Sequence, residues 1–336
     1  MATVLVTGGT GLIGANICRR LRERGDDVRA LVRPGSEYAP LRELGVTPVE
    51  GDITSASDVL AAADTAEYVV HSAAVLGGAS QDAGEHASVN TGGLGNVLDA
   101  AAAVGARRTV ALGTTTYFDY GDKPLSEESP VLDEPPADPY SVSKRAAFVE
   151  TMRRAADGLD ACVVIPGGTF GPSPVPGRAL EAPSYNLRIL LALDGAIEAT
   201  VRFPIPWSYA DDVAAVAVAA LDRGVAGEKY LAFASPDDVC SMAEFLNRAC
   251  ELAGAAHRVR DVTGDDLERD AELRRESGPS LVALAHRRFP EPYYTDTLTR
   301  ERLGHTPLRL DEALRRTLDW LARTHRADRP GADPAN

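Results

Sequence analysis

Cysteine is scarce in this 336-residue chain, and the four cysteines are far apart: Cys18, Cys162, Cys240 and Cys250. Since no C-x-x-C pair occurs, the sequence indicates neither a zinc site nor a disulfide framework. The six histidines are scattered as well, so we expect no metal centre. The cysteines are therefore expected to be small buried residues of a protein in a reducing compartment.

Long apolar runs and surplus positive charge are also absent. No apolar stretch is long enough to span a bilayer, and the first strand-like run begins at about residue 2, which leaves no room for a signal peptide. Lys and Arg number 35 against 49 Asp and Glu, a formal net charge of −14. Such an acidic surface repels phosphate backbones and anionic lipids. We therefore expect a soluble, cytoplasmic protein with no nucleic-acid or membrane partner.

Short apolar segments alternate with segments of helical periodicity. The expected strands lie at residues 4–6, 28–32, 46–49, 68–70, 109–112 and 161–165, and the expected helices at 12–24, 58–63, 90–104 and 140–156. This alternation predicts an α/β fold with a doubly wound parallel sheet and right-handed crossovers. Because the chain exceeds the size of a single core, we expect a second lobe after the sixth strand.

A glycine-rich turn, TGGTGLIG over residues 7–14, follows the first expected strand and opens the first expected helix. Gly8 permits a tight turn, Gly11 lets the backbone approach a pyrophosphate, and Gly14 lets helix and strand pack closely. The free N–H groups at the helix start can then bind the phosphates. The glycine pattern alone is weak evidence, but its place between strand and helix predicts a dinucleotide site. The turn residues expected at the cofactor are Gly8, Thr10, Gly11, Leu12 and Ile13.

The end of the second strand indicates which dinucleotide binds. An acidic residue there would hold the adenosine ribose of NAD, but residues 30–36 read ALVRPGS. Arg33 can pair with a 2′-phosphate, which favours NADP, and the alternative is a solvated Arg33 in an enzyme that accepts NAD. Asp52 and Ile53 end the third strand and are expected at the adenine, the alternative for Asp52 being a helix cap.

Tyr140 and Lys144 are four residues apart in an expected helix, so they project from one face. Asp138 and Pro139 before them are typical of a helix start. A tyrosine hydroxyl with its usual pKa of ~10 is a poor acid–base catalyst, and a neighbouring ammonium lowers that pKa. This spacing alone is common, but next to a dinucleotide site it predicts that Tyr140 exchanges a proton with a carbonyl or hydroxyl oxygen.

A third group is expected to hydrogen-bond the substrate oxygen. The fifth strand ends in LGTTTY over residues 112–117, and ligands bind at the carboxyl ends of such strands. Thr114 is the preferred candidate, with Thr115 as the second choice.

With these motifs in place, the chain resembles the extended (epimerase/dehydratase-like) short-chain dehydrogenase/reductase family over nearly its whole length. The resemblance is carried by TGGTGLIG (7–14), GDI (51–53), HSAA (71–74), VNTGGLGNVLDAA (89–101), GTT (113–115), YSVSK (140–144), PGGTFGP (166–172) and YADDVA (209–214). One departure is Thr114, where the family usually has Ser, and both residues carry the needed hydroxyl.

The resemblance implies a Rossmann-type fold and roles for further residues. It implies that Lys144 also holds the nicotinamide ribose, and that Asn90 supports the active-site helix or a proton-relay water near the cofactor. It implies a homodimer through the helices at about 90–104 and 140–156. The residues that it places along the cofactor are Ser72, Ala73, Ala74, Pro166, Gly168 and Thr169.

The domain organisation follows from the same motifs. We expect an NAD(P)-binding Rossmann domain at residues 1–166 and a smaller, mostly helical substrate-binding lobe at 167–325. Residues 205–235 are expected to return to the first domain. The tail at 326–336 has no apolar residue larger than Ala or Pro, and we expect it to be disordered.

The family contains two kinds of enzyme, and the pattern here is closest to the dihydroflavonol reductase and 3β-hydroxysteroid dehydrogenase branch. Nucleotide-sugar enzymes usually have an Asn where this chain has Gly168, and an Arg near Ile205. Three arginines remain as candidates to clamp a substrate diphosphate, with ordinary surface charges as an equally good explanation: Arg178, Arg188 and Arg202.

The lobe sequence is rich in apolar residues, which suits a hydrophobic carbonyl compound, with core packing as the alternative explanation. The sequence therefore predicts an NADP(H)-dependent reductase or dehydrogenase acting on a ketone, aldehyde or secondary alcohol. One alternative is a nucleotide-sugar epimerase or dehydratase with tightly bound NAD, and another is a catalytically idle NADPH sensor. Asp211 and Asp212 are expected to cap the helix that they begin.

Overall fold

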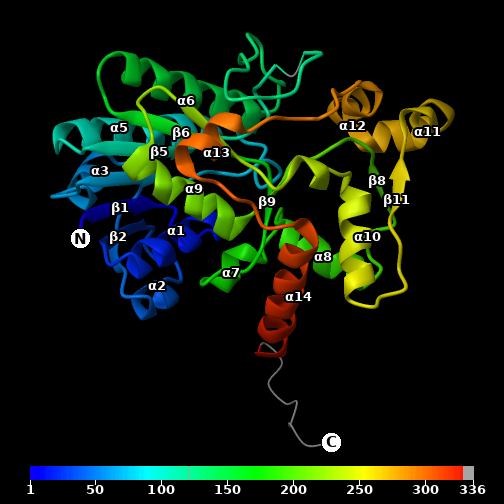
Figure 1. Cartoon of the computed structure of the whole chain (residues 1–336), viewed down its shortest axis with the longest axis horizontal. Helices are drawn as coiled ribbons and strands as arrows, with labels where there is room; N and C mark the ends of the chain where they lie inside the picture. The colour runs from blue at the N-terminus through cyan, green and yellow to red at the C-terminus, as the bar shows by residue number, and fades with distance from the viewer. Residues whose placement is uncertain (120, 328–336) are drawn as a thin grey trace, which may run out of the picture.

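The computed structural model describes residues 1–119 and 121–327, and its centre is a seven-stranded parallel sheet (Figure 1). The strand order is β10-β6-β5-β4-β1-β2-β3. The predicted doubly wound parallel sheet is therefore confirmed, and the order reverses between β1 and β4. The strands are β1 (Thr3–Thr7), β2 (Asp27–Val32), β3 (Thr47–Glu50), β4 (Tyr68–His71), β5 (Arg108–Leu112), β6 (Ala161–Pro166) and β10 (Lys229–Ala232).

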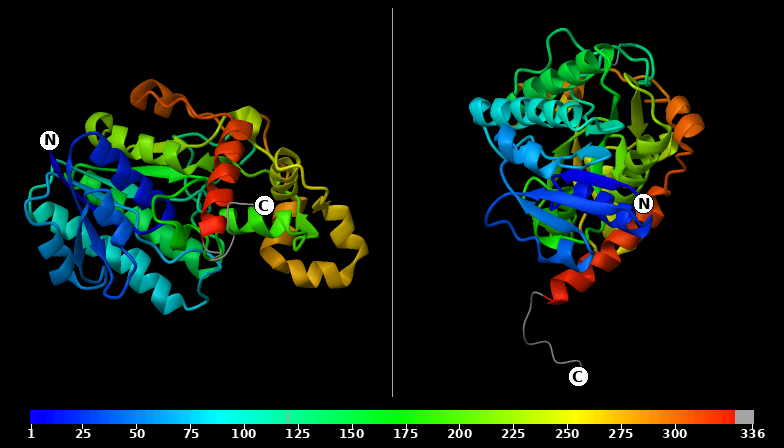
Figure 2. Two further views of the ribbon diagram at one scale, coloured as in Figure 1. Left: turned by 90° about the horizontal axis from the view of Figure 1, so that it is seen from below. Right: turned by 90° about the vertical axis from the view of Figure 1, so that its left-hand side faces the viewer.

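Helices cover both faces of this sheet, which explains why its central strands are apolar throughout (Figures 1 and 2). On one face, α1 (Leu12–Glu23) and α9 (Ala210–Arg223) pack on alternate residues of β1 such as Val4 and Val6. On the other face lie α3 (Ala56–Ala62), α5 (Gly93–Ala103) and α6 (Pro139–Ala156). The short helix α2 (Ala39–Glu43) precedes β3, α4 (Ala83–His86) follows β4, and a π-helical turn, η1 (Ala87–Gly92), leads into α5.

The second lobe has its own core, formed where two short parallel strand pairs meet several helices. Trp207 of β9 stacks on Phe245 of α10, with ring centroids 3.7 Å apart. Its elements are β7 (Gly168–Phe170), α7 (Pro176–Ala179), α8 (Tyr185–Leu193), β8 (Ala199–Val201), β9 (Trp207–Tyr209), the 3₁₀ turn η2 (Pro236–Asp238), α10 (Met242–Leu252), β11 (Arg260–Val262), α11 (Gly264–Arg269), α12 (Ala271–His286) and α14 (Leu310–Ala327). Helix α13 (Thr297–Leu303) instead packs against α9 and β10, where Leu303 joins the core of the main sheet.

Residues 205–235 supply β9, α9 and β10, and β10 pairs with β6 at one edge of the main sheet. The expected domain boundaries stay a prediction. Of the tail expected from residue 326, residues 328–336 lie outside the described part of the chain, and α14 includes residues 326 and 327.

The expected capping role of Asp211 and Asp212 is wrong. The residue that precedes α9 is Tyr209, and no side chain caps this helix. Asp211 instead accepts hydrogen bonds from Arg19 and Arg20 of α1, one of them at 2.8 Å from Arg20 Nη2. Asp212 accepts from the Leu308 N–H at 2.8 Å. Both carboxylates therefore join distant segments, which helix-start chemistry alone does not reveal.

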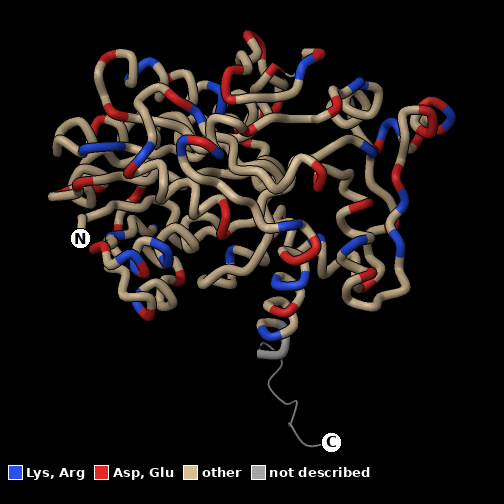
Figure 3. Tube along the Cα trace, in the orientation of Figure 1, with Lys and Arg blue, Asp and Glu red and all other residues tan. Residues whose placement is uncertain are grey.

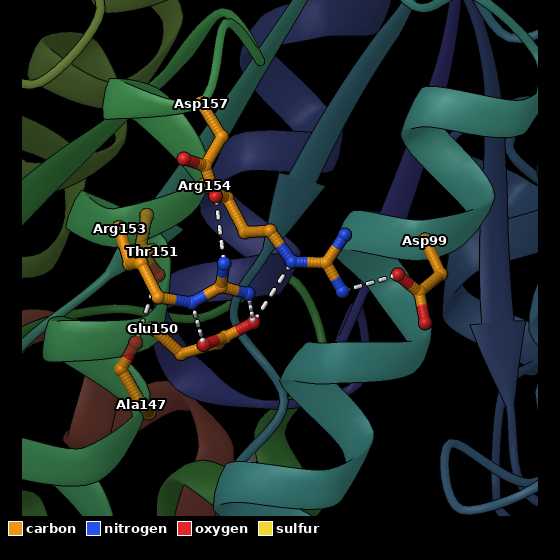
Figure 4. A network of polar contacts seen from close by, with 7 residues as sticks. All are labelled: Asp99, Ala147, Glu150, Thr151, Arg153, Arg154 and Asp157. Atoms are coloured by element: carbon orange, nitrogen blue, oxygen red, sulfur yellow. Dashed lines mark hydrogen bonds and ion pairs between the residues drawn. The ribbon is translucent and has the colours of Figure 1, made fainter.

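Helices α5 and α6 are joined by an ion-pair network (Figure 4). Glu150 accepts hydrogen bonds from Arg153 and Arg154, and Arg154 also pairs with Asp99 of α5. The two arginines lower the pKa of Glu150 to about 2. The network helps to hold the carboxyl-terminal half of α6, the helix whose first turns carry Tyr140 and Lys144.

Charged residues of both signs are spread over the outer elements, and they alternate along α14 (Figure 3). Among residues 1–119 and 121–327, no helix combines the length and the apolar character that crossing a membrane requires.

Candidate active site

A cavity of about 1880 Å³ lies at the carboxyl ends of the strands, between the sheet and the second lobe. This volume exceeds the ~300–1,000 Å³ of a typical small-ligand pocket, so a dinucleotide and a second molecule can share it. All of the expected site residues except Asn90 line the cavity: Gly8, Thr10, Gly11, Leu12, Ile13, Arg33, Asp52, Ile53, Ser72, Ala73, Ala74, Thr114, Tyr140, Lys144, Pro166, Gly168 and Thr169.

The glycine-rich turn has the close approaches that its sequence predicts. Gly8 has φ +73°, and a Cβ there would lie 2.6 Å from the backbone nitrogen of Ala73. A Cβ on Gly14 would lie 2.1 Å from the carbonyl oxygen of Gly8. Gly11 directly precedes α1, whose start has no side-chain cap and no acidic residue in the first turn. The free N–H groups of that turn therefore suit the phosphates of a dinucleotide.

The adenosine end of the cavity is marked by Arg33 and Asp52. Arg33 is exposed, and its guanidinium makes no hydrogen bond or ion pair with any other described residue. Asp52 accepts hydrogen bonds from the N–H and hydroxyl of Thr54 at 2.8 and 2.7 Å, which lower its pKa. Since Ser55 is the N-cap of α3, Asp52 is not the cap of that helix. Ile53 is buried and provides an apolar wall.

The start of α6 places the other candidate groups, and its local sequence explains how. Asp138 caps the helix by accepting from the Ser141 N–H at 2.9 Å, and Pro139 takes the first helical position, as predicted. Tyr140 and Lys144 then face the end of β5. The ammonium of Lys144 donates to the carbonyl oxygen of Leu112 at 2.7 Å. Strand β5 and helix α6 thus bring three candidate groups, Thr114, Tyr140 and Lys144, to one wall of the cavity.

The Tyr140 ring is held on several sides. A Cβ on Gly77 would lie 3.2 Å from its Cδ1 atom, so the loop after β4 passes directly over the ring. His86 packs edge-on against it, with ring centroids 6.2 Å apart. The Thr114 side chain lies close enough to the Tyr140 phenol to favour its ionised form and so lower its pKa. The phenol is therefore oriented toward the end of β5. A residue bulkier than glycine at position 77 would displace the Tyr140 ring.

The expectation that Lys144 lowers the pKa of Tyr140 is not met. Burial raises the pKa of Tyr140, and the Thr114 side chain opposes this only in part. Burial also lowers the pKa of Lys144 to about 8. The physical reason is that burial dominates at both residues, and the Lys144 ammonium is bonded to the Leu112 carbonyl instead of the phenol.

Asn90 does not line the cavity, contrary to its place among the expected cofactor residues. Its side chain bridges the backbone N–H and carbonyl of Val75, at 2.8 and 3.1 Å, and donates to the Ser143 hydroxyl at 3.0 Å. Asn90 lies in the π-helical turn η1, a distortion that often occurs at functional sites. It therefore supports the loop after β4 and the start of α6, which is the first of the two roles that the resemblance implies.

Below the site, His71 at the end of β4 is buried and shares a 2.8 Å hydrogen bond with the Thr7 hydroxyl. Burial lowers its pKa to about 3, with a further contribution from the positive charge of Lys144. His71 is thus neutral near pH 7 and links β4 to β1.

The substrate side of the cavity includes a segment that sequence reasoning missed. Residues of α12 and the chain after it line the cavity, and α12 changes direction at Gly278, which has φ +76°. Nothing in this segment's composition marks it as part of a site, because it reaches the cavity only through the packing of the lobe. The residues concerned are Glu276, Ser277, Pro279, Ser280, Leu281, Ala283, Leu284, Arg287, Phe289 and Tyr293.

Gly168 and Ile205, the two positions that separate the family's branches, are neighbours in space. A Cβ on Gly168 would lie 3.0 Å from Ile205 and from the Trp207 ring. An Asn at 168 would therefore need this packed wall to move. Among the described residues, no group of three or more His, Cys, Asp or Glu is placed to hold a metal ion.

A parallel doubly wound sheet with a glycine turn at β1 defines a dinucleotide-binding protein. Comparison with known proteins names the family: residues 4–233 match the NAD dependent epimerase/dehydratase family, and the chain belongs to it. The resemblance to the extended short-chain dehydrogenase/reductases is thereby confirmed, and the chain is an NAD(P)-dependent oxidoreductase.

Relatives include sterol demethylase protein B from Methylococcus capsulatus, 30% identical over 256 residues that cover 75% of each chain. A second is 2-alkyl-3-oxoalkanoate reductase from Stenotrophomonas maltophilia, 28% identical, covering 93% of this chain and 97% of the relative. Relatives named 3β-hydroxysteroid dehydrogenase and dihydroflavonol 4-reductase match about half of this chain, at 33% and 34% identity.

The fold is also that of solved enzymes with nucleotide-sugar ligands. The structure of dTDP-glucose 4,6-dehydratase from Streptomyces venezuelae, with NAD and TYD bound, superposes with a TM-score of 0.78. The two chains are 21% identical, and the match covers 97% of this chain and 98% of the other. At this identity the similarity concerns the fold.

Proposed function

We propose that this protein is an NADP(H)-dependent reductase or dehydrogenase that interconverts a ketone or aldehyde with an alcohol. The observation that carries this proposal is the meeting of Thr114, Tyr140 and Lys144 on the cavity wall beside the glycine-rich turn. The dinucleotide, when bound, supplies or accepts the hydride.

Each of the three residues has a separate task in this proposal. Tyr140 gives a proton to the substrate oxygen during reduction, or takes one during oxidation. Thr114 orients that oxygen and the Tyr140 phenol through its hydroxyl. Lys144, with a pKa of about 8, is cationic near pH 7, so it can bind the nicotinamide ribose and stabilise a phenolate.

NADP is the proposed cofactor, because the exposed and unpaired Arg33 follows β2 where NAD-specific chains have an acid. Its positive charge reaches Asp52, whose pKa it helps to lower. An adenosine 2′-phosphate between β2 and β3 would give Arg33 a charge-assisted partner.

A net redox reaction is favoured over a nucleotide-sugar isomerisation by the wall at Gly168. Ile205 and Trp207 occupy the space that an Asn side chain would need there. The Stenotrophomonas relative, which this chain matches over 97% of its length, is named a reductase. We therefore place the chain with the reductases and propose a hydrophobic small-molecule substrate.

We further propose that the chain works as a homodimer through α5 and α6. Val142 and Val149 lie seven residues apart on α6 and are 48% and 42% exposed, so they form part of one apolar stripe. Light scattering of the purified protein tests this, and a monomer at micromolar concentration would refute it. Fractionation of expressing cells tests the proposed cytoplasmic location.

The central experiment is the Tyr140→Phe variant, assayed with NADPH and a panel of apolar ketones. Loss of general acid catalysis costs about 10²- to 10⁴-fold in rate, while NADPH binding, followed by fluorescence, stays as in the wild type. A variant that keeps more than a tenth of the wild-type rate would contradict the assignment of Tyr140.

Release of cofactor on denaturation distinguishes the branches. Denatured protein that yields stoichiometric NAD, held through purification, would overturn the reductase proposal in favour of a nucleotide-sugar enzyme. Failure of both NADPH and NADH to support any turnover, with NADPH still bound, would instead favour a sensor.

A further inference from the structure

Three arginines of the second lobe are candidates for anion binding by their sequence, and the structure distinguishes them. A fourth, Arg287, also lines the cavity, and its guanidinium lies 5.4 Å from the centroid of the Phe289 ring. Arg178 is exposed, and its Nε atom lies 3.7 Å from the Glu181 carboxylate. Arg202 does not line the cavity and lies 3.9 Å from each of the Glu244 and Asp261 carboxylates. Positive charge on both is thus already balanced by neighbouring carboxylates.

Arg188 differs from the other two. It lines the cavity and is only partly exposed, yet its guanidinium makes no hydrogen bond or ion pair with any other described residue. A guanidinium withdrawn from water without a partner is unfavourable unless an anion compensates it. The position therefore suits an anionic group that arrives with a ligand.

Helix α8 holds Arg188 at the reacting end of the cavity. The buried side chain of Asn186 bonds the N–H and carbonyl of Gly171, both at 2.9 Å, which anchors the helix. Tyr185, one turn before Arg188, packs edge-on against Trp207 with ring centroids 5.2 Å apart. Tyr185 also lies close enough to both Tyr140 and Arg188 for their charges to interact.

Apolar side chains line this part of the cavity together with charged ones such as Glu181 and Glu276. Leu76 and Leu281 are 51% and 37% exposed and both line the cavity, together with Phe203 and Met242. One unpaired guanidinium beside apolar walls matches an amphiphilic monoanion. A carboxylate accepts two parallel hydrogen bonds from one guanidinium, whereas a diphosphate would require paired cations, which Arg178 and Arg202 do not provide.

We propose that Arg188 binds the carboxylate of the substrate, and that the substrates are oxo- or hydroxycarboxylic acids with an apolar chain. The reaction rests on the proposed function, but carboxylate binding by Arg188 does not. In the oxidative direction the hydride of the carbinol C–H passes to NADP⁺, and the hydroxyl proton passes to the ionised phenolate of Tyr140. The C–O bond becomes C=O, and the carboxylate stays bound to Arg188 throughout.

Binding can be tested without turnover. Calorimetry of the NADPH-loaded protein compares the binding of octanoate with that of octanamide. The two ligands have the same alkyl chain, and only octanoate carries a negative charge. We expect octanoate to bind the wild type at least about tenfold more tightly, and Arg188→Gln to weaken octanoate by about 10- to 100-fold with little change for octanamide. Arg178→Gln is the matched control and should alter neither ligand more than about threefold, while Arg188→Lys should restore part of the affinity.

Turnover gives the second readout, with 3-hydroxyoctanoate and its methyl ester as probes. Arg188→Gln should lower kcat/KM for the acid by a similar factor, chiefly through KM, and leave the ester unchanged. Unaltered NADPH binding and circular dichroism show that the variant is folded.

Three results would overturn the carboxylate proposal. The first is that the wild type binds octanoate and octanamide with equal affinity. The second is that Arg188→Gln and Arg178→Gln lose equal amounts of octanoate affinity. The third is that UDP binds more tightly than octanoate and that its binding depends on Arg188. If octanoate binding depends on Arg188 but no hydroxy acid is oxidised and no oxo acid is reduced, the carboxylate site stands and the proposed reaction fails.

Discussion

The ammonium of Lys144 donates a hydrogen bond to the carbonyl oxygen of Leu112 at 2.7 Å. This bond joins the start of α6 to the end of β5, which carries Thr114. Two segments that are 32 residues apart are thereby brought into one wall, and the buried lysine is kept within reach of the Tyr140 helix face.

Burial of Lys144 should reduce the stability of the fold near neutral pH. The unfolded chain binds this proton with the usual pKa of 10.5 and the folded chain with one of about 8, so the difference costs about 3 kcal/mol below pH 8. Lys144→Met should therefore abolish turnover but raise the free energy of unfolding at pH 7. The gain is reduced by the loss of the hydrogen bond from Lys144 to Leu112. Urea denaturation measures this, and the gain should shrink between pH 8 and 10. A variant that is less stable than the wild type at pH 7 would contradict the prediction.

Removing the Thr114 hydroxyl should lower catalysis without loss of cofactor. Thr114 is 8% exposed and lies close enough to the Tyr140 phenol to affect its pKa, so Thr114→Val takes away the hydroxyl that we propose orients both phenol and substrate oxygen. We expect kcat to fall by about 10²- to 10³-fold, as for other donors to a reacting oxygen. Thr114→Ser keeps the hydroxyl and should retain most activity. Equal activities of the Val and Ser variants would show that the hydroxyl has no such role.

Arg33 should decide the preference between the two dinucleotides. Arg33→Ala removes the one cation at the end of β2, so KM for NADPH should rise by about 10- to 100-fold, the value of a charge-assisted hydrogen bond. KM for NADH should change little. Steady-state kinetics with both cofactors measures the ratio. Arg42 lies on the following helix, outside the cavity lining, and Arg42→Ala serves as the control for a general loss of positive charge.

His71 should make stability depend on pH in the mildly acidic range. The unfolded chain binds a proton at about pH 6.5 and the folded chain only near pH 3, so the unfolded state takes up more protons between these values. The contribution of neutral His71 to the free energy of unfolding is complete above pH 6.5. It decreases by about 1.4 kcal/mol for each pH unit as the pH falls below that value. Urea unfolding of wild type and His71→Gln between pH 7.5 and 5 tests the slope. An unchanged slope in the variant would assign the pH dependence to other groups.

Some features of this protein were determined by the sequence alone, because they depend on neighbouring residues. The tight turn at Gly8, the close packing at Gly14 and the cap at Asp138 were all predictable, since each is a property of a few consecutive residues. The same holds for the shared helix face of Tyr140 and Lys144. Alternating apolar strands and amphipathic helices likewise predicted the parallel sheet, because a sheet covered on both faces needs that pattern.

Tertiary structure alone decided the contacts between distant segments and the pKa values that burial sets. Asp211 meets α1 instead of capping its own helix, and Asn90 is bonded to Val75 and Ser143 instead of lining the cavity. Burial raises the pKa of Tyr140 where spacing predicted that Lys144 would lower it. The unpaired guanidinium of Arg188 lies at the substrate end because of the position of α8, which Asn186 anchors to Gly171. Local periodicity encodes which element forms, whereas desolvation and pairing depend on which elements pack together.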